Sequence, residues 1–419
     1  MMRKNRKKRF LKALAVILAV ITAFVGITTV ITVVGLRANI NKAHSFPNAE
    51  CEQIKIEEVY DGYWNIYSDD GLKVMQLTDT HFGGGWMSLK KDSMAMNAIA
   101  AMITAEKPDL VIVTGDVAFP VPFKAGTFNN KSGAKLFAEL MESLGVYWTV
   151  SFGNHDTEAY SYYDREEIVE FYEQYPHCLV REGAADVDGS ANQVFNIVKS
   201  NGVITRSLFT IDSHSYVDGD YLGIMWKYDN IHENQIKWYS DIIESNRNHN
   251  RMKLYASSDS NFLKENPTLN VPSSVFLHVP LAEYKDAWNE YVDNGYADSE
   301  NVKYNYGKAG ESGQVIYHGL YEDDFFETMQ ELHSTDTVFC GHDHLNNFSV
   351  NYEGIDLTYS FSVDYLAYSG IYKLGSQRGC TIIEIDENGG IEYSAQNYYQ
   401  DKYTSQYSKE EVTMQELGE

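Results

Sequence analysis

The sequence predicts an α/β fold with buried sheets, preceded by a single membrane-spanning helix. Short apolar runs alternate with segments whose apolar residues recur at helical spacing, which is typical of strands and helices that alternate along a chain. One uninterrupted apolar segment near the N-terminus is far longer than any strand. The 419 residues, 44% of them hydrophobic, suffice for a large core, and we expect one globular domain after the anchor.

The first 36 residues differ in composition from the rest of the chain. Residues 1–12 carry seven Lys or Arg and no acidic residue, and residues 13–36 carry no charge. These 24 residues exceed the roughly 20 that cross a bilayer as a helix. A cationic flank stays on the cytoplasmic side. We therefore expect a basic cytoplasmic tail (1–12), a retained signal-anchor (13–36) and an extracellular body, which would be secreted if the segment were cleaved.

The body beyond this segment is strongly acidic. Without the seven N-terminal cations, 27 of the 34 Lys and Arg remain against 59 Asp and Glu, a net charge of −32. Such a body repels nucleic acid, so we expect no nucleic-acid partner. We assign residues 37–70 to a polar stalk and lead-in segment, 71–400 to the globular domain and 401–419 to a C-terminal tail. Cys340 and Cys380 lie in apolar runs, where we expect buried thiols.

The predicted elements of the body follow in order from Leu72. Strands are expected at 72–77, 109–114, 146–151, 207–212, 273–278 and 337–340. Helices are expected, from apolar spacing and helix-forming residues, at 94–105, 133–144 and 234–247. The strand-rich segment 356–399 should form a second sheet that packs on the first. Residues 286–323 are too many for a plain connection, and we expect a functional loop there.

Five of these strands run directly into residue types that bind metal ions. In chain order they are Asp79 and His81, then Asp116, then Asn154 with His155 and Asp156, then His278, and finally His342 with His344. Ligands bind at the carboxyl ends of strands in α/β sheets, so distant residues can converge there. A single Asp-x-His or Gly-Asp is usually structural, but all five motifs together indicate a metal site. Carboxylates and imidazoles without thiolates suit Fe, Mn or Zn.

Two divalent or trivalent ions that share a carboxylate would suit this set. Asp116 is the natural bridging ligand, because Gly115 before it lets the backbone turn sharply. Two ions about 3.5–4 Å apart can each hold a phosphate oxygen and generate hydroxide near neutral pH. His155, beside Asp156, fits the group that protonates the leaving oxygen. The pattern therefore predicts hydrolysis of phosphate esters.

The motif series DTH, GD, GNHD, H and GHDH resembles the calcineurin-like metallophosphoesterase superfamily over residues 72–385. Within it, HVPLAEY (278–284), FFETM (325–329) and VFCGHDHLNNF (338–348) are similar to small purple-acid-phosphatase-like phosphoesterases. The resemblance implies a four-layer α/β/β/α sandwich. It implies one metal held by Asp79, His81 and His344, a second held by Asn154, His278 and His342, and Asp116 between them. It also makes His155 the acid or phosphate-binding histidine, oriented by Asp156.

One position departs from the purple enzymes of this superfamily. They place a Tyr shortly after the bridging Asp, whereas Val117-Ala118-Phe119 follows Asp116 here. Phe119 cannot ligate iron, so an iron–tyrosinate centre is not expected and the metal identity stays open. Two further features are secondary: Gly83-Gly84-Gly85 is favoured as a loop, and Arg378 should either reach substrate or stabilise strand ends.

The substrate class is also open at this stage. The leading prediction is a phosphomonoesterase at the outer face of the membrane, acting on a small-molecule or lipid-linked phosphate ester. A phosphodiesterase, or a nucleotide or lipid pyrophosphate hydrolase, would use the same two-metal core. A non-catalytic surface binding protein on the same fold is disfavoured, because a decayed site would not require every ligand.

Overall fold

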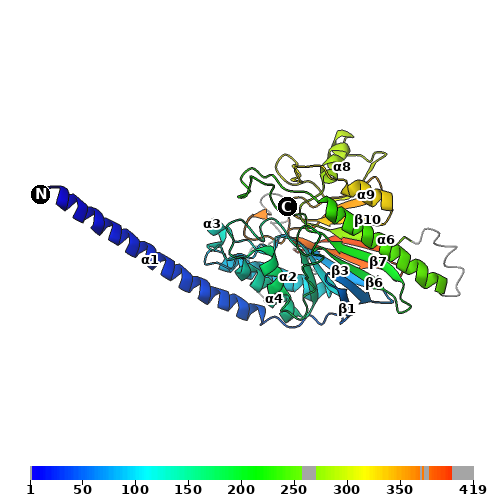
Figure 1. Cartoon of the computed structure of the whole chain (residues 1–419), viewed down its shortest axis with the longest axis horizontal. Helices are drawn as coiled ribbons and strands as arrows, with labels where there is room; N and C mark the ends of the chain where they lie inside the picture. Colours follow the sequence, from blue (N-terminus) through cyan, green and yellow to red (C-terminus); the bar gives the residue numbers. More distant parts are fainter. Residues whose placement is uncertain (1, 257–269, 369, 372–376, 399–419) are drawn as a thin grey trace.

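One long helix leads into a body of two sheets covered by helices (Figure 1). The computed structural model describes residues 2–256, 270–368, 370–371 and 377–398. The helix, α1 (Met2–Ala43), contains the predicted anchor and is long and apolar enough to cross a membrane. The predicted C-terminal tail, 401–419, lies outside the described residues.

The smaller sheet carries the first three predicted strands at its parallel core. Its order is β14 (Ile391–Asn397), β13 (Gly379–Ile385), β3 (Leu72–Leu77), β4 (Leu110–Thr114), β5 (Tyr147–Ser151). β3, β4 and β5 are parallel, and their nearly continuous apolar sequences suit strands buried on both faces. β13 runs antiparallel to β3, and β14 antiparallel to β13.

The larger sheet has nine strands and carries the other three predicted strands. Its order is β1 (Lys55–Tyr60), β2 (Tyr63–Tyr67), β6 (Gln193–Val198), β7 (Ile204–Thr210), β8 (Ser273–Phe276), β10 (Thr335–Cys340), β12 (Ile355–Tyr359), β11 (Ser349–Tyr352), β9 (Val302–Tyr306). β7, β8, β10 and β12 are mutually parallel, so their carboxyl ends reach the same edge.

Helices cover the outer face of each sheet. The smaller sheet packs on α2 (Leu89–Glu106), α4 (Asn130–Leu144) and α5 (Arg165–Tyr172). The larger sheet packs on α6 (Glu233–Ala256), α8 (Ala282–Asp293) and α9 (Phe325–Leu332). A third core, with residues of both sheets, fills the space between them. These contacts confirm the four-layer α/β/β/α order.

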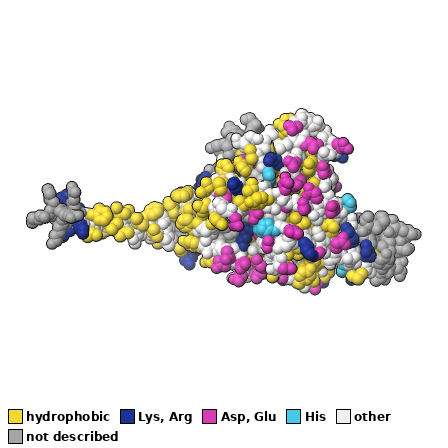
Figure 2. Space-filling view, turned by 45° about the horizontal axis from the view of Figure 1, so that its top comes forward, with side chains coloured by type: hydrophobic (Ala, Val, Ile, Leu, Met, Phe, Trp, Pro, Cys, Tyr) yellow, Lys and Arg dark blue, Asp and Glu magenta, His cyan; other side chains and the backbone are white. Residues whose placement is uncertain are grey.

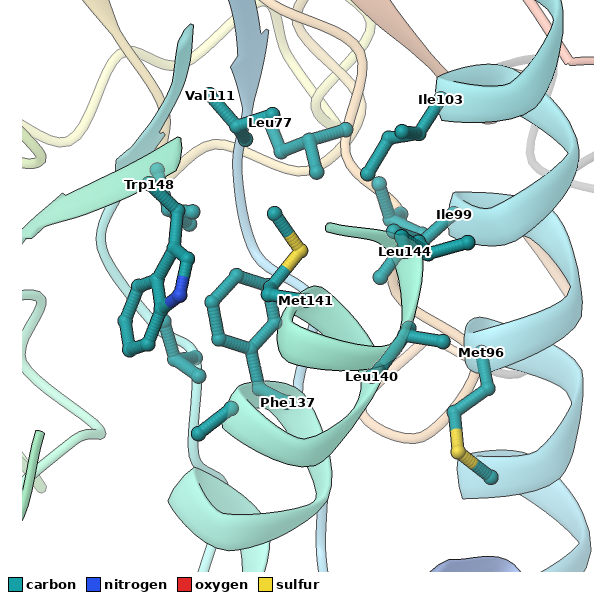
Figure 3. Close-up of a cluster of buried hydrophobic side chains, with 14 of the residues drawn as sticks. Leu77, Met96, Ile99, Ile103, Val111, Phe137, Leu140, Met141, Leu144 and Trp148 are labelled. Atoms are coloured by element: carbon teal, nitrogen blue, oxygen red, sulfur yellow. The ribbon is translucent and has the colours of Figure 1, made fainter. Parts of the chain in front are cut away.

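Figure 3 shows the layer between the smaller sheet and its helices. Side chains from α2 and α4 face those of the strands: Met96, Ile99, Ile103, Phe137, Leu140, Met141 and Leu144 against Leu77, Val111 and Trp148. All of them are fully buried. At about 1.5–3 kcal/mol for each large apolar side chain, this layer fixes the smaller sheet firmly on its helices.

The segment 37–70, predicted as a stalk and lead-in segment, contacts the body along much of its length. Residues 37–43 continue α1, and its last turn packs into the body, where Ala43 is fully buried. β1 and β2, also within 37–70, pair as a hairpin at the edge of the larger sheet. The polar composition of 37–70 hid these contacts, because β1 is an edge strand whose side chains are mostly exposed.

Two further predictions are corrected by the structure. Residues 286–323 are not a single loop, since they contain most of α8 and all of β9. Their many Tyr and Asn residues masked the helical spacing of the buried Tyr284, Trp288 and Tyr291. The segment 356–399 does not form a separate sheet: its strands divide between the two sheets, because β12 pairs with β10 and β13 pairs with β3.

Candidate metal centre

The loops that follow five strands bring the predicted ligands to one place. Asp79 and His81 follow β3, Asp116 follows β4, Asn154 follows β5, His278 follows β8, and His342 and His344 follow β10. The first three strands belong to the smaller sheet and the last two to the larger sheet. The centre therefore lies where the carboxyl ends of both sheets meet, as the alternation of strands and polar residues predicted.

Four of these residues form a first buried cluster. Asp79, His81, Asp116 and His344 each offer a ligand atom, and these atoms lie within 4.8 Å of one another. His81 Nε2 is 3.1 Å from Asp116 Oδ2, and His344 Nε2 is 3.3 Å from Asp79 Oδ1. Asp79 Oδ1 is buried, and its contact with His344 Nε2 does not have the geometry of a hydrogen bond. An orphaned carboxylate oxygen is costly in a protein interior, and a metal ion would satisfy it.

A second cluster adjoins the first through Asp116. His278 Nε2 lies 3.3 Å from Asp116 Oδ2, 3.2 Å from Asn154 Oδ1 and 3.3 Å from His342 Nδ1. Asp116 Oδ2 thus faces both clusters, while its Oδ1 accepts a hydrogen bond from the backbone N–H of His155 at 2.8 Å. One carboxylate oxygen between two sets of nitrogen and oxygen donors is what a bridging ligand requires. The donor set fits two metal ions.

The backbone is held in an unfavourable conformation at four of these ligands. The φ angles are 51° at Asp79, 48° at His81, 54° at Asp116 and 76° at His342. A left-handed non-glycine residue costs about 1–3 kcal/mol and persists where the surrounding structure imposes it, commonly at functional sites. The loops after β4 and β5 also approach each other so closely that only glycine fits at position 153, because a Cβ there would lie 2.2 Å from Asp116 Oδ1.

The charges of the two clusters are strongly coupled. Burial alone would raise the pKa of Asp116, but the positive charges of His278 and His155 bring it well below its ordinary value. Burial would lower the pKa of His278, but Asp116 raises it to about 9. Burial and the charge of His278 together lower the pKa of His342 well below its ordinary value. Metal ligands must be deprotonated, so a metal ion bound at His278 would displace the proton of that ring.

A carboxylate that the sequence patterns did not single out supports the first cluster. Asp364 is fully buried, and its two oxygens lie 3.4 Å from His81 Nδ1 and 3.1 Å from His344 Nδ1. Contacts of this kind leave Nε2 of each ring as the metal-binding nitrogen and fix the ring orientation. The sequence pattern that could have identified Asp364 is an Asp shortly after the end of a strand, β12, just as Asp116 follows β4.

Glu158, and not Asp156, orients His155. His155 Nδ1 lies 2.6 Å from Glu158 Oε1. The Asp156 carboxylate instead accepts hydrogen bonds from three backbone N–H groups, those of Asp116, Gly153 and Ala118. Burial and the nearby Asp116 charge raise the pKa of Asp156 to about 6. Asp156 therefore holds together the loops after β4 and β5, which corrects its predicted role beside His155.

Aromatic side chains contact several of the proposed metal ligands. Phe119 stacks on His81 with ring centroids 4.5 Å apart and has no oxygen to offer a metal. Tyr216 accepts a hydrogen bond from Asn154 Nδ2 at 2.8 Å, which leaves Asn154 Oδ1 directed at His278. Sequence reasoning missed Tyr216, because it lies in a loop that follows no site strand.

Neither secondary feature contributes a described residue to the pocket that holds the proposed metal ligands. Arg378 is fully buried, donates from Nε to the carbonyl oxygen of Asp364 at 2.8 Å, and lies over the ring of Tyr365. It therefore stabilises the segment after β12 and is not among the described residues that line the pocket. The N–H groups of Gly83 and Gly84 donate to the Asp92 carboxylate at 2.8 and 3.1 Å, so they form a fixed loop and no phosphate cradle.

Comparisons with known proteins identify the family of the chain. The sequence model of calcineurin-like phosphoesterases matches residues 72–346. The chain is 27% identical over 338 residues to "Probable inactive purple acid phosphatase 29" of Arabidopsis thaliana, covering 76% of the chain and 77% of that protein. It is 26% identical over 302 residues to "Phosphatase DCR2" of Saccharomyces cerevisiae, covering 67% of the chain and 45% of that protein. A crystal structure of a dimetal phosphatase from Danio rerio has a TM-score of 0.49 at 9% sequence identity, and the match covers 78% of the chain and 97% of that protein.

Proposed function

The chain belongs to the calcineurin-like phosphoesterase family, and we propose that it hydrolyses phosphomonoesters at the outer face of a membrane. The observation that carries the proposal is the pair of buried clusters joined by one oxygen of Asp116. The apolar helix α1 with its basic N-terminal flank supports the location, because such flanks stay in the cytoplasm.

The proposed ligands divide between two ions. One ion would be held by Asp79, His81 and His344, the other by Asn154, His278 and His342, with Asp116 shared between them. Such ions supply Lewis acidity toward phosphate oxygens and lower the pKa of water. The donor set fits Fe, Mn and Zn.

His155 is the proposed proton donor to the leaving oxygen. It lines the same pocket as Asp116 and His344, and its backbone N–H is tied to Asp116. Because Glu158 accepts the Nδ1–H of the ring, Nε2 is the nitrogen that can give a proton to the departing oxygen. Phe119 packs edge-on against His155 and limits water on that side of the ring.

A non-catalytic binding protein is the alternative of another class. The word "inactive" in the name of the Arabidopsis relative describes that protein. In the present chain every proposed ligand, His155 and its partner Glu158 are in place. This complete arrangement supports catalysis over binding alone.

Metal-restored hydrolysis tests the proposal. The full chain in detergent would be stripped by chelation, given Mn, Zn or Fe in turn, and assayed with mono- and bis-nitrophenyl phosphate. We expect turnover of the monoester. His155→Ala should keep its metal and lose about 10²–10⁴-fold in turnover of an alkyl phosphate, whose leaving group needs protonation. Preference for the diester would support the phosphodiesterase alternative. Tight, metal-dependent binding of phosphate without turnover would support the binding protein.

A further inference from the structure

Four aromatic residues line the same pocket as several of the proposed metal ligands. They are Trp226, Tyr228, Tyr317 and Tyr368, and the pocket encloses about 260 Å³. This volume is below the roughly 300–1,000 Å³ of pockets that hold drug-sized ligands, so it suits a small ester. Hydrolysis at phosphorus requires none of these rings. They are therefore available to the part of the ester beyond its phosphate.

Each of the four rings meets a neighbouring ring edge to face. The centroids of Trp226 and Tyr317 are 6.0 Å apart, and their planes cross at 76°. The rings of Tyr228 and Tyr368 meet two of the proposed ligand histidines at 83° and 88°. Rings at such angles offer their faces in different directions around one space. This arrangement suits an alkylated ammonium group, which aromatic faces attract by cation–π interaction.

Trp226 is held at the rim of the pocket although its side chain is 64% exposed. The Asp220 carboxylate accepts the backbone N–H of Met225 at 3.1 Å and that of Lys227 at 3.2 Å, one residue on either side of Trp226. Ile224 and Met225 are exposed as well. Exposed apolar residues that lie together mark an interaction surface. The loop therefore presents a fixed indole ring to a molecule that enters the pocket.

The charged residues of the pocket favour a cation over an anion. Glu311 lines the pocket, and none of its described lining residues is Lys or Arg. Glu311 Oε1 accepts the backbone N–H of Leu345 at 3.2 Å, which fixes the position of the carboxylate. Burial and then the charge of Glu311 raise the pKa of Tyr317, and they raise that of Tyr368 to about 12. This carboxylate therefore lies near both phenol rings.

The charge of the whole body acts in the same direction. Without the N-terminal cations it amounts to −32, and Figure 2 shows Asp and Glu side chains over much of the face in view. A negative field lowers the local concentration of polyanions and raises that of cations. A nucleotide or pyrophosphate would bring further negative charge close to Glu311. A phosphate ester whose remainder is positively charged fits both the pocket and its surroundings.

We propose that Trp226, Tyr317, Tyr368 and Glu311, which we name the ammonium cage, bind the ammonium group of a phosphate ester of an amino alcohol, such as phosphocholine. This inference rests on the proposed function for the reaction at phosphorus. Water adds to phosphorus and gives up a proton, and the bond between phosphorus and the alcohol oxygen breaks. That oxygen takes a proton from His155. The products are the amino alcohol and inorganic phosphate, and the ammonium cage determines which ester is hydrolysed.

A matched pair of esters tests the ammonium cage. Phosphocholine and 3,3-dimethylbutyl phosphate have the same shape, but only phosphocholine carries the positive charge. Their kcat/KM values would be measured on the metal-loaded full-length chain in detergent. Glu311→Gln and Trp226→Leu should each lower the ratio of the two values about 3- to 30-fold relative to wild type, because a contact with the cation is lost. Comparison of ratios cancels the intrinsic difference between the two leaving groups.

Two substitutions outside the pocket are the controls. Glu300→Gln removes one exposed carboxylate, and Tyr221→Leu removes an exposed ring from the loop that carries Trp226. Both should keep the wild-type ratio. Sphingosine 1-phosphate and octadecyl phosphate, compared in mixed micelles, test a lipid source of the same ammonium group. A lower ratio in the cage variants with either pair of esters supports the cage and identifies the source. An unchanged ratio with both pairs, or an equal change in the controls, overturns it.

Binding of choline alone separates the ammonium cage from the reaction. Choline would be titrated into the full-length chain while tryptophan fluorescence is recorded. We expect a saturable change in wild type that is lost in Trp226→Leu and weakened in Glu311→Gln, since a cation over an indole ring perturbs its emission. No saturable change in wild type overturns the inference. A saturable change together with no hydrolysis of any monoester supports the cage and contradicts the proposed monoesterase function.

Discussion

Asp364→Asn isolates the carboxylate that orients two proposed metal ligands. Asp364 is fully buried and contacts Nδ1 of both His81 and His344. Burial alone would raise its pKa, but the positive charge of His81 and the hydrogen bond with His344 hold that pKa well below its ordinary value. Asn keeps the shape of the side chain and one acceptor oxygen. It removes the negative charge that fixes both rings.

The expected effect is a loss of metal affinity. Replacing an outer carboxylate of this kind typically weakens binding about 10- to 100-fold, or about 1.4–2.7 kcal/mol. Because Asp364 contacts two ligands of the same ion, we expect the upper part of this range. The assay is competition between the stripped chain and a fluorescent chelator for Mn or Zn at pH 7. At saturating metal, turnover should return to near the wild-type value.

Asp92→Asn is the matched control. Asp92 is also buried, but its carboxylate accepts hydrogen bonds from Gly83, Gly84 and Ser88 and touches no histidine. Its substitution should leave metal affinity unchanged. Wild-type affinity in Asp364→Asn would refute the orienting role, and an equal loss in Asp92→Asn would show a general effect of altering buried carboxylates.

Three further predictions concern the surroundings of the centre. Glu158→Gln should lower turnover of alkyl phosphates about tenfold or more while metal content stays constant, because Nδ1 of His155 loses its charged partner. If the variant loses the same fraction of its activity on alkyl esters as on nitrophenyl esters, this role is contradicted. Burial would raise the pKa of Asp212, but the Arg165 charge lowers it. The stability from this pair is thus full above the unfolded pKa of about 4 and is lost as the pH falls through the lower folded pKa. Asp212→Asn should cost about 3–5 kcal/mol of unfolding free energy at pH 7 and less at pH 3, measured by urea unfolding; a cost independent of pH would contradict the assignment. Finally, the iron-loaded chain should show no tyrosinate charge-transfer band, since the residue that stacks on His81 is Phe119, which has no phenol oxygen to bind iron. A purple colour would contradict this prediction.

The convergence of the proposed ligands could be predicted from the sequence because its signal is local. Asp79, Asp116 and His278 each follow an apolar strand closely, and parallel strands bring their carboxyl ends together whatever the length of chain between them. The four-layer order came from the resemblance of the motif series to a known superfamily, and the three cores confirm it.

The parts that sequence reasoning missed depend on long-range pairing. Asp364 follows β12, which was assigned to a separate sheet, although β12 pairs with β10 beside His342 and His344. Tyr216 lies in a loop whose path to Asn154 leaves no periodic signal. Glu158 was within reach of local reasoning, since it stands three residues after His155, but the adjacent Asp156 was the more conspicuous carboxylate.

The central claim is that two ions share Asp116, and metal stoichiometry tests it most directly. The stripped full-length chain would be loaded with Mn, freed of excess metal and measured for bound ions per chain, together with phosphate release from a monoester. We expect about two ions per wild-type chain, and in Asp116→Asn the loss of at least one ion together with hydrolysis. Two ions and full activity retained in Asp116→Asn, or a wild-type chain that binds none, would contradict the shared centre.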